Sequence, residues 1–100
     1  MSVELFHYDC LMAELKMVAT LVIVFDENRY KHRTKATAAL ANAYRTLAET
    51  RYLLDPGLLT TTQHVSILDR CADLEQQMRE RLQQWSTSIA SHSVQARLVH

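Results

Sequence analysis

The stretch that decides the fold is Asp55-Pro56-Gly57, because it holds the only proline and the only glycine of the 100-residue chain. Average usage would give about five prolines and about seven glycines in this length. Folds rich in strands need many turns, and turns depend on these two residue types. The scarcity of both therefore favours helices, with a firm break at this stretch.

The sequence on either side of the break predicts three helices. Thr60, Thr61 and Thr62 offer N-caps for a helix over residues 63–90. Residues 2–54 contain neither breaker, yet a single helix of that length would extend about 80 Å. The polar stretch 26–33 is the natural place for the chain to turn back, which gives helices over residues 3–25 and 35–54. Short connections make neighbouring helices antiparallel.

We therefore predict an all-α fold, a small antiparallel three-helix bundle that fills residues 1–90. Residues 91–100 are polar and weakly patterned, and they are predicted to form a frayed C-terminal tail. The β-branched residues between positions 18 and 25 leave a strand as an alternative for that segment. Helix is preferred there because no second strand is evident for pairing.

Composition and charge describe one ordered domain. Hydrophobic residues make up 48% of the chain and charged residues 22%, which is ordinary for a globular protein. Eleven cationic residues balance eleven anionic ones, so no global field attracts nucleic acid or an anionic membrane. No signal-peptide pattern is present, and the longest apolar run is about half a membrane span. We expect a cytoplasmic protein that does not contact the membrane.

The first predicted helix carries two apolar stripes on nearly opposite sides, and only one of them can face the other two helices. The stripe assigned to the core of the chain contains Val3, Phe6, Cys10, Ala13, Met17, Leu21 and Val24. The other stripe is predicted to need cover from outside and contains Leu5, Tyr8, Met12, Leu15, Ala19 and Ile23.

The third predicted helix is longer than the second, so its C-terminal apolar residues are predicted to need cover too. These residues are Met78, Leu82, Trp85 and Ile89. Leaving such side chains in water would forfeit about 1.5 to 3 kcal/mol each. The bundle is therefore predicted to be completed by dimerisation or by a protein hetero-partner, with a symmetric homodimer as the simplest arrangement. The rival interpretation is a monomer with the first helix at its centre.

The sequence predicts no catalytic residue, no cofactor, no metal site and no small-molecule substrate. It contains no glycine-rich loop and no signature around a nucleophile. Cys10 and Cys71 are interpreted as reduced, buried core thiols. A disulfide between them, or a metal site formed with His7, remains a minor alternative.

The basic turn, residues 29–35, is the one candidate for binding nucleic acid. Its cations could contact phosphates and its tyrosine could stack on a base, through Arg29, Tyr30, Lys31, Arg33 and Lys35. A solvated turn is the preferred interpretation, because no adjacent helix has the spacing of a groove-reading element. The leading hypothesis is a non-enzymatic helical protein-interaction module, such as a small regulator, inhibitor or chaperone-like protein. The alternative is a nucleic-acid-binding regulator that uses the basic turn.

Overall fold

The computed structural model describes the backbone of residues 3–99 and the side chains of residues 6–86. It contains three helices, α1 (Val3–Asn28), α2 (Arg33–Leu53) and α3 (Thr61–Val99), with a short 3-10 helix η1 (Pro56–Leu58) before α3. No strand occurs in the described backbone, and positions 18–25 are helical. The predicted all-α three-helix bundle is confirmed. No helix among the described residues is both long and apolar enough to cross a membrane.

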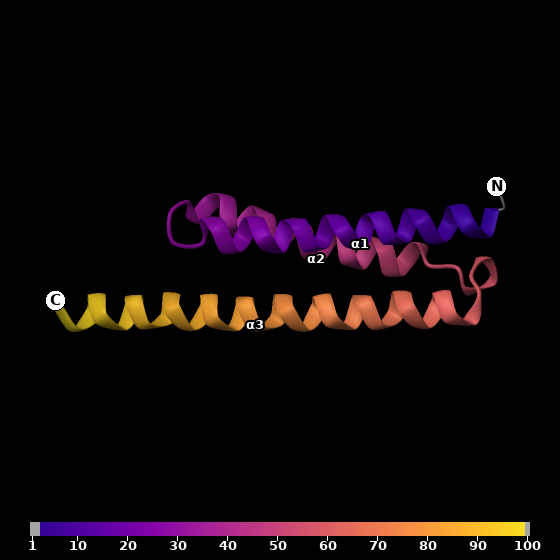
Figure 1. Cartoon of the computed structure of the whole chain (residues 1–100). Coiled ribbons are helices and arrows are strands. Elements are labelled where there is room, and N and C mark those ends of the chain that lie inside the picture. The colour runs from indigo at the N-terminus through magenta and orange to yellow at the C-terminus, as the bar shows by residue number, and fades with distance from the viewer. Residues whose placement is uncertain (1–2, 100) are drawn as a thin grey trace.

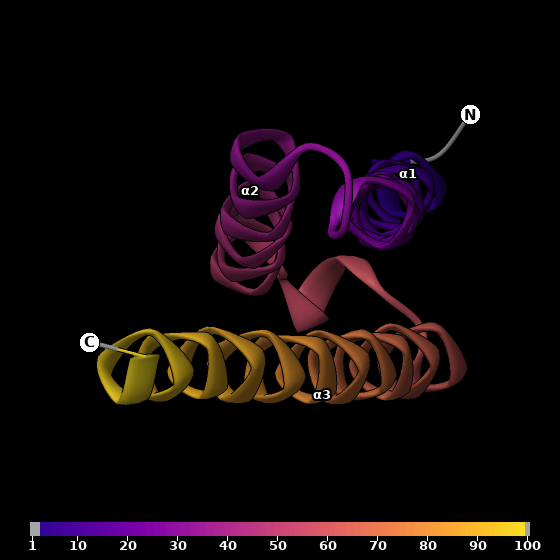
Figure 2. The ribbon, with the colours of Figure 1, turned by 90° about the vertical axis from the view of Figure 1, so that its left-hand side faces the viewer.

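The α1 and α2 helices form an antiparallel hairpin, and α3 runs along it parallel to α1 (Figure 1). Seen along α1, the third helix crosses the hairpin obliquely (Figure 2). At 1.5 Å per residue, the 39 residues of α3 span about 58 Å, whereas the 26 residues of α1 span about 39 Å. The C-terminal part of α3 therefore projects past the hairpin (Figure 1).

The projecting end of α3 makes the molecule long and narrow. The molecule measures 64 × 19 × 17 Å, and its radius of gyration is 17.3 Å. A compact domain of this length would have a radius of gyration of about 13 Å. The bundle is therefore elongated, with one helix that its own chain supports over only part of its length.

Local hydrogen bonds explain where the helices begin and end. At the end of α1, the Asn28 amide donates to the Val24 carbonyl oxygen at 2.8 Å. The break before α3 is fixed by Asp55, whose carboxylate accepts from the Gly57 backbone N–H at 3.0 Å. Thr60 then caps α3, because its hydroxyl oxygen accepts from the Gln63 N–H at 3.1 Å while the Gln63 side chain accepts from the Thr60 N–H at 3.0 Å. This reciprocal pair is a capping box.

The boundaries of α3 differ from the predicted helix over residues 63–90. The helix begins two residues earlier, at Thr61, and it continues to Val99. The side chains beyond residue 86 lie outside the described residues, so the predicted fraying of residues 91–100 stays a prediction.

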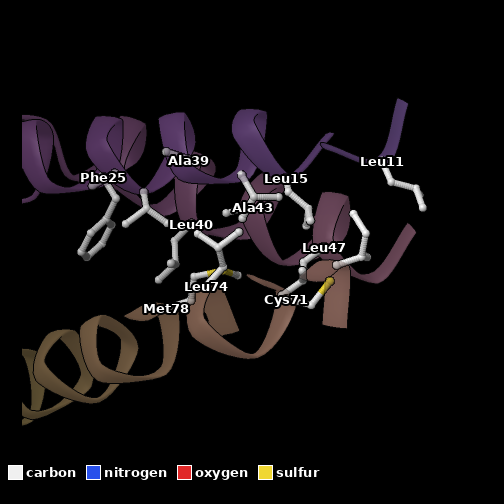
Figure 3. Close-up of a cluster of buried hydrophobic side chains, with 14 residues drawn as sticks. Leu11, Leu15, Phe25, Ala39, Leu40, Ala43, Leu47, Cys71, Leu74 and Met78 are labelled. Carbon is white, nitrogen blue, oxygen red and sulfur yellow. The ribbon is translucent and has the colours of Figure 1, made fainter. Parts of the chain in front are cut away.

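The core lies where the three helices meet, and Figure 3 shows its side chains pointing toward one another. One apolar face of α2 and one of α3 pack into this core. From α2 and α3 the core takes Ala36, Ala39, Leu40, Ala43, Leu47, Ile67, Cys71, Leu74 and Met78. Thr50 is buried beside them, and its hydroxyl donates to the Thr46 carbonyl oxygen at 2.8 Å. The core therefore leaves no buried hydroxyl without a partner there.

The predicted core face of α1 is wrong. The buried row of this helix consists of Leu11, Leu15, Val18, Val22 and Phe25. Four of these residues belong to neither predicted stripe, and the fifth belongs to the stripe that was predicted to face outward. The two stripes are the flanks of one broad apolar arc, and this row is the centre of the arc.

Candidate functional site

Two of the predicted interface residues belong to the core of the chain, and this corrects the predicted interface. Leu15 is only 1% exposed and Met78 is fully buried. Both lie among the core side chains in Figure 3. They are covered by the three helices of the same chain, so they offer almost no surface to a partner while the bundle stays intact.

The other predicted interface residues lie in varied surroundings. Half-buried positions at the edge of the core are Tyr8, Met12, Ala19 and Trp85. Ile23 is 56% exposed and Leu82 is 43% exposed. The side chains of Leu5 and Ile89 lie outside the described residues.

The stripe that was predicted to be core forms an uncovered apolar surface on α1. We call this surface the outer stripe, and it consists of Phe6, Cys10, Ala13, Met17, Leu21 and Val24. Phe6 is 61% exposed and Met17 is 54% exposed, Cys10 and Ala13 are exposed, and Leu21 and Val24 are half-buried. The prediction that Cys10 is buried is therefore wrong. Val3 was also assigned to this stripe, and its side chain lies outside the described residues.

Two open grooves flank α3, because this helix crosses the hairpin obliquely. The α1–α3 groove has a volume of about 330 Å³ and is lined by Met12, Ala13, Leu15, Lys16, Ala19 and Arg70. The α2–α3 groove has a volume of about 570 Å³ and is lined by Arg33, Thr34, Thr37, Ala38, Ala41 and Trp85. Both grooves combine apolar or methyl-bearing walls with arginine.

Trp85 is the aromatic wall of the α2–α3 groove. Its ring system makes a T-shaped contact with Phe25, with ring centroids 5.4 Å apart and an interplanar angle of 70°. The guanidinium of Arg33 lies 5.8 Å from the Trp85 ring centroid, within the range of a cation–π contact. The indole is therefore held by the core from one side while it lines the groove from the other.

The basic turn loses one of its nearest carboxylates to α3. Arg81 donates to both carboxylate oxygens of Asp26 at 2.8 Å, and this hydrogen bonding raises the pKa of Arg81. Among the described residues, no ion pair involves any of the four cations of the turn. Arg29 lies 4.8 Å from the Tyr30 ring centroid and donates to the Gln84 side chain at 3.4 Å. Because Asp26 is paired with Arg81, the cations of the turn keep their positive charge unpaired.

The minor alternatives for the cysteines gain no support from the geometry. Both cysteines are free, with Cys10 exposed and Cys71 buried, and burial raises the pKa of the Cys71 thiol. The His7 ring accepts from the Asp55 backbone N–H through Nε2 at 3.1 Å. Across the described part of the chain, no three His, Cys, Asp or Glu residues are grouped so as to hold a metal ion.

An ion-pair network joins α2 to α3 through Glu75. Arg79, four positions further along α3, lies 3.3 Å from its carboxylate. Arg51 of α2 also reaches Glu75, at 2.9 Å, a contact between helices that no local pattern on α3 indicates. The hydrogen bond from Arg51 is the main reason why the pKa of Glu75 lies below its usual value.

We expect Glu75 to make the stability of the fold depend on pH in the acidic range. A lowered folded-state pKa means that the stabilisation is complete above the ordinary glutamate pKa and is lost as the pH falls through the lowered value. Glu75→Gln should therefore flatten the decline of the melting temperature as the pH falls below the ordinary glutamate pKa. Glu49→Gln is the control, because Glu49 has no ion pair among the described residues. Equal pH profiles for the two variants would contradict this role.

The surface features of the described residues are the outer stripe, the two grooves and the basic turn. No protein-family model, curated protein or solved structure matches this chain significantly.

Proposed function

We propose that this chain is a non-enzymatic helical protein-interaction module, a small regulator, inhibitor or chaperone-like protein that acts by binding another protein. The α2–α3 groove is the observation that carries the proposal. Amphipathic helices are commonly bound in apolar grooves between helices. Tryptophan and arginine are the residues enriched at binding hot spots, and Trp85 and Arg33 line this groove together.

The projecting part of α3 supports the same function. Helices without tertiary packing are marginal in water below about 12–15 residues. The part of α3 that runs past the hairpin (Figure 1) would therefore gain stability from a partner that packs along it. The α2–α3 groove lies close to this part, because Trp85 is one of its walls.

The proposal includes a cytoplasmic location and binding without a cofactor or a small-molecule substrate. Free cysteines persist in reducing compartments, and both Cys10 and Cys71 are free. The exposure of Cys10 supports such a compartment more strongly than a buried thiol would.

A charged side chain placed in the wall of the α2–α3 groove tests the proposed function. Partners captured by the wild-type chain from its native host should be purified and their affinities measured against two variants. Ala41→Glu places a charge in the groove wall, whereas Ala48→Glu places the same charge at an exposed position of α2 outside the lining. We expect Ala41→Glu to weaken binding at least about tenfold, or about 1.4 kcal/mol, and Ala48→Glu to leave it unchanged. Equal effects of the two variants, or no specific partner, would contradict the proposal.

Nucleic-acid binding by the basic turn is the second candidate. The engagement of Asp26 by Arg81 favours it, because the cations of the turn then keep their charge available for phosphates. Binding of single- and double-stranded oligonucleotides should be measured at two or more salt concentrations. A steep loss of affinity with rising salt supports phosphate contacts, and absence of binding at low salt excludes this candidate.

A further inference from the structure

We propose that the outer stripe of α1 is the contact surface for a second copy of this chain, and that the two α1 helices pair in antiparallel orientation. The inference goes beyond the proposed function, because it concerns a different surface from the α2–α3 groove.

The outer stripe contains two of the largest exposed apolar side chains of α1. Phe6 and Met17 are each more than half exposed, although they flank a row of the same helix that is fully packed in the core. Exposed apolar groups that lie in a row, rather than singly, are typical of interaction surfaces. The stripe therefore needs cover that the described helices of its own chain do not provide.

The spacing of the stripe fits a helix-pair seam. In heptad notation, positions 10, 17 and 24 are a positions and positions 6, 13 and 20 are d positions. Thr20 is not part of the outer stripe, but its spacing places it in the seam. Its hydroxyl donates to the Lys16 carbonyl oxygen at 3.0 Å, which satisfies its polar group within the helix. The seam thus continues for about five turns of α1.

The stripe is complementary to itself when the second helix runs in the opposite direction. In this arrangement Cys10 lies against Ala13 of the second copy. Met17 then lies against Phe6 of the second copy, because Met17 follows Cys10 by seven residues and Phe6 precedes Ala13 by seven. Small side chains then meet at the centre and allow close approach. The methionine sulfur meets an aromatic ring, which is a favourable contact.

The charges that border the seam select this orientation. Asp9 and Lys16 lie seven residues apart and occupy the same heptad position beside the seam. Antiparallel pairing sets Asp9 beside Lys16 of the second copy, and the two-fold axis creates this ion pair twice. Parallel pairing instead sets Asp9 beside Glu14 of the second copy, where like charges repel. Among the described residues neither Asp9 nor Lys16 has an ion pair, and neither has an opposite charge three or four positions away on its own helix.

Sedimentation equilibrium of the full chain at micromolar concentrations tests the contact surface. Wild type should form dimers, and Met17→Glu should weaken dimerisation at least about a hundredfold, because it buries charge in the seam. Leu68→Glu, at an exposed apolar position of α3, should leave the dimer intact. Circular dichroism should show that both variants remain folded, since both replaced side chains are exposed. Labelling of the Cys10 thiol should slow as the dimer forms.

Charge reversal tests the orientation. Asp9→Lys and Lys16→Asp should each weaken the dimer about three- to tenfold, and the double variant should restore it. In a parallel dimer Asp9→Lys would instead strengthen association, and that result would overturn the proposed orientation. A wild-type chain that stays monomeric, or a Met17→Glu dimer as tight as wild type, would overturn the contact surface. A monomer that still binds a partner through the α2–α3 groove would leave the proposed function standing.

Discussion

Leu15→Glu is expected to unfold the protein, whereas Ile23→Glu is expected to leave it folded. Leu15 is 1% exposed and Ile23 is 56% exposed. A glutamate at position 15 would lose the apolar contacts of a buried leucine and bring an unpaired carboxylate into the core, at a combined cost of at least about 5 kcal/mol. That cost equals or exceeds the whole stability of many small domains. At position 23 the carboxylate stays in water, and the effect should remain within about 1 kcal/mol.

Thermal melts followed by circular dichroism distinguish the two outcomes. The pair is a matched control, because both positions lie on α1 and both belong to the stripe that was predicted to face a partner. If both variants remained folded with similar melting temperatures, Leu15 would not be a core residue of the monomer. If both unfolded, the apolar arc of α1 would be buried more widely than the structure shows.

The error at Leu15 shows what the spacing of apolar residues on α1 could not decide. Polar residues at positions 7 and 14 lie close to the centre of the apolar arc, so they divided it into two apparent stripes. The structure explains one of them, because His7 accepts a hydrogen bond from the Asp55 backbone N–H. That contact depends on where the chain returns after α2, and no local pattern on α1 encodes it.

The other two helices were predictable because each has one apolar face and clear start or stop signals. Asp55, Pro56 and Gly57 marked the break, and the capping threonines marked the start of α3. The far end of α3 was not predictable, because the sequence after residue 63 contains neither glycine nor proline to stop the helix.

The candidate surfaces were predicted only in part, because some of them depend on how the helices pack against one another. Trp85 was identified because it continues the apolar spacing of the third helix. The pairs of Asp26 with Arg81 and of Arg51 with Glu75 join different helices, so they follow from the approach of α3 to the hairpin. The grooves beside α3 likewise follow from its oblique crossing, which the sequence pattern does not specify.

Phe25→Ala is expected to destabilise the fold by about 3–5 kcal/mol, because Phe25 is fully buried and its removal leaves a large cavity. Part of the loss is the edge-on contact with Trp85, which is worth about 0.5–1.5 kcal/mol beyond the buried area. Phe25 lies near the turn end of the hairpin, so its loss should also loosen α3 where that helix leaves the bundle. Phe25→Leu keeps most of the volume and should cost about 1.5 kcal/mol or less.

Urea denaturation followed by fluorescence measures this effect directly, because Trp85 is the only tryptophan of the chain. Phe6→Ala is the control, since Phe6 is the only other phenylalanine and is mostly exposed. It should change the free energy of unfolding by no more than about 0.5 kcal/mol at concentrations where the chain is monomeric. In Phe25→Ala the native emission of Trp85 should shift toward longer wavelength, because the indole gains contact with water. A Phe25→Ala variant as stable as Phe6→Ala would mean that α3 is not anchored to the hairpin through this aromatic pair.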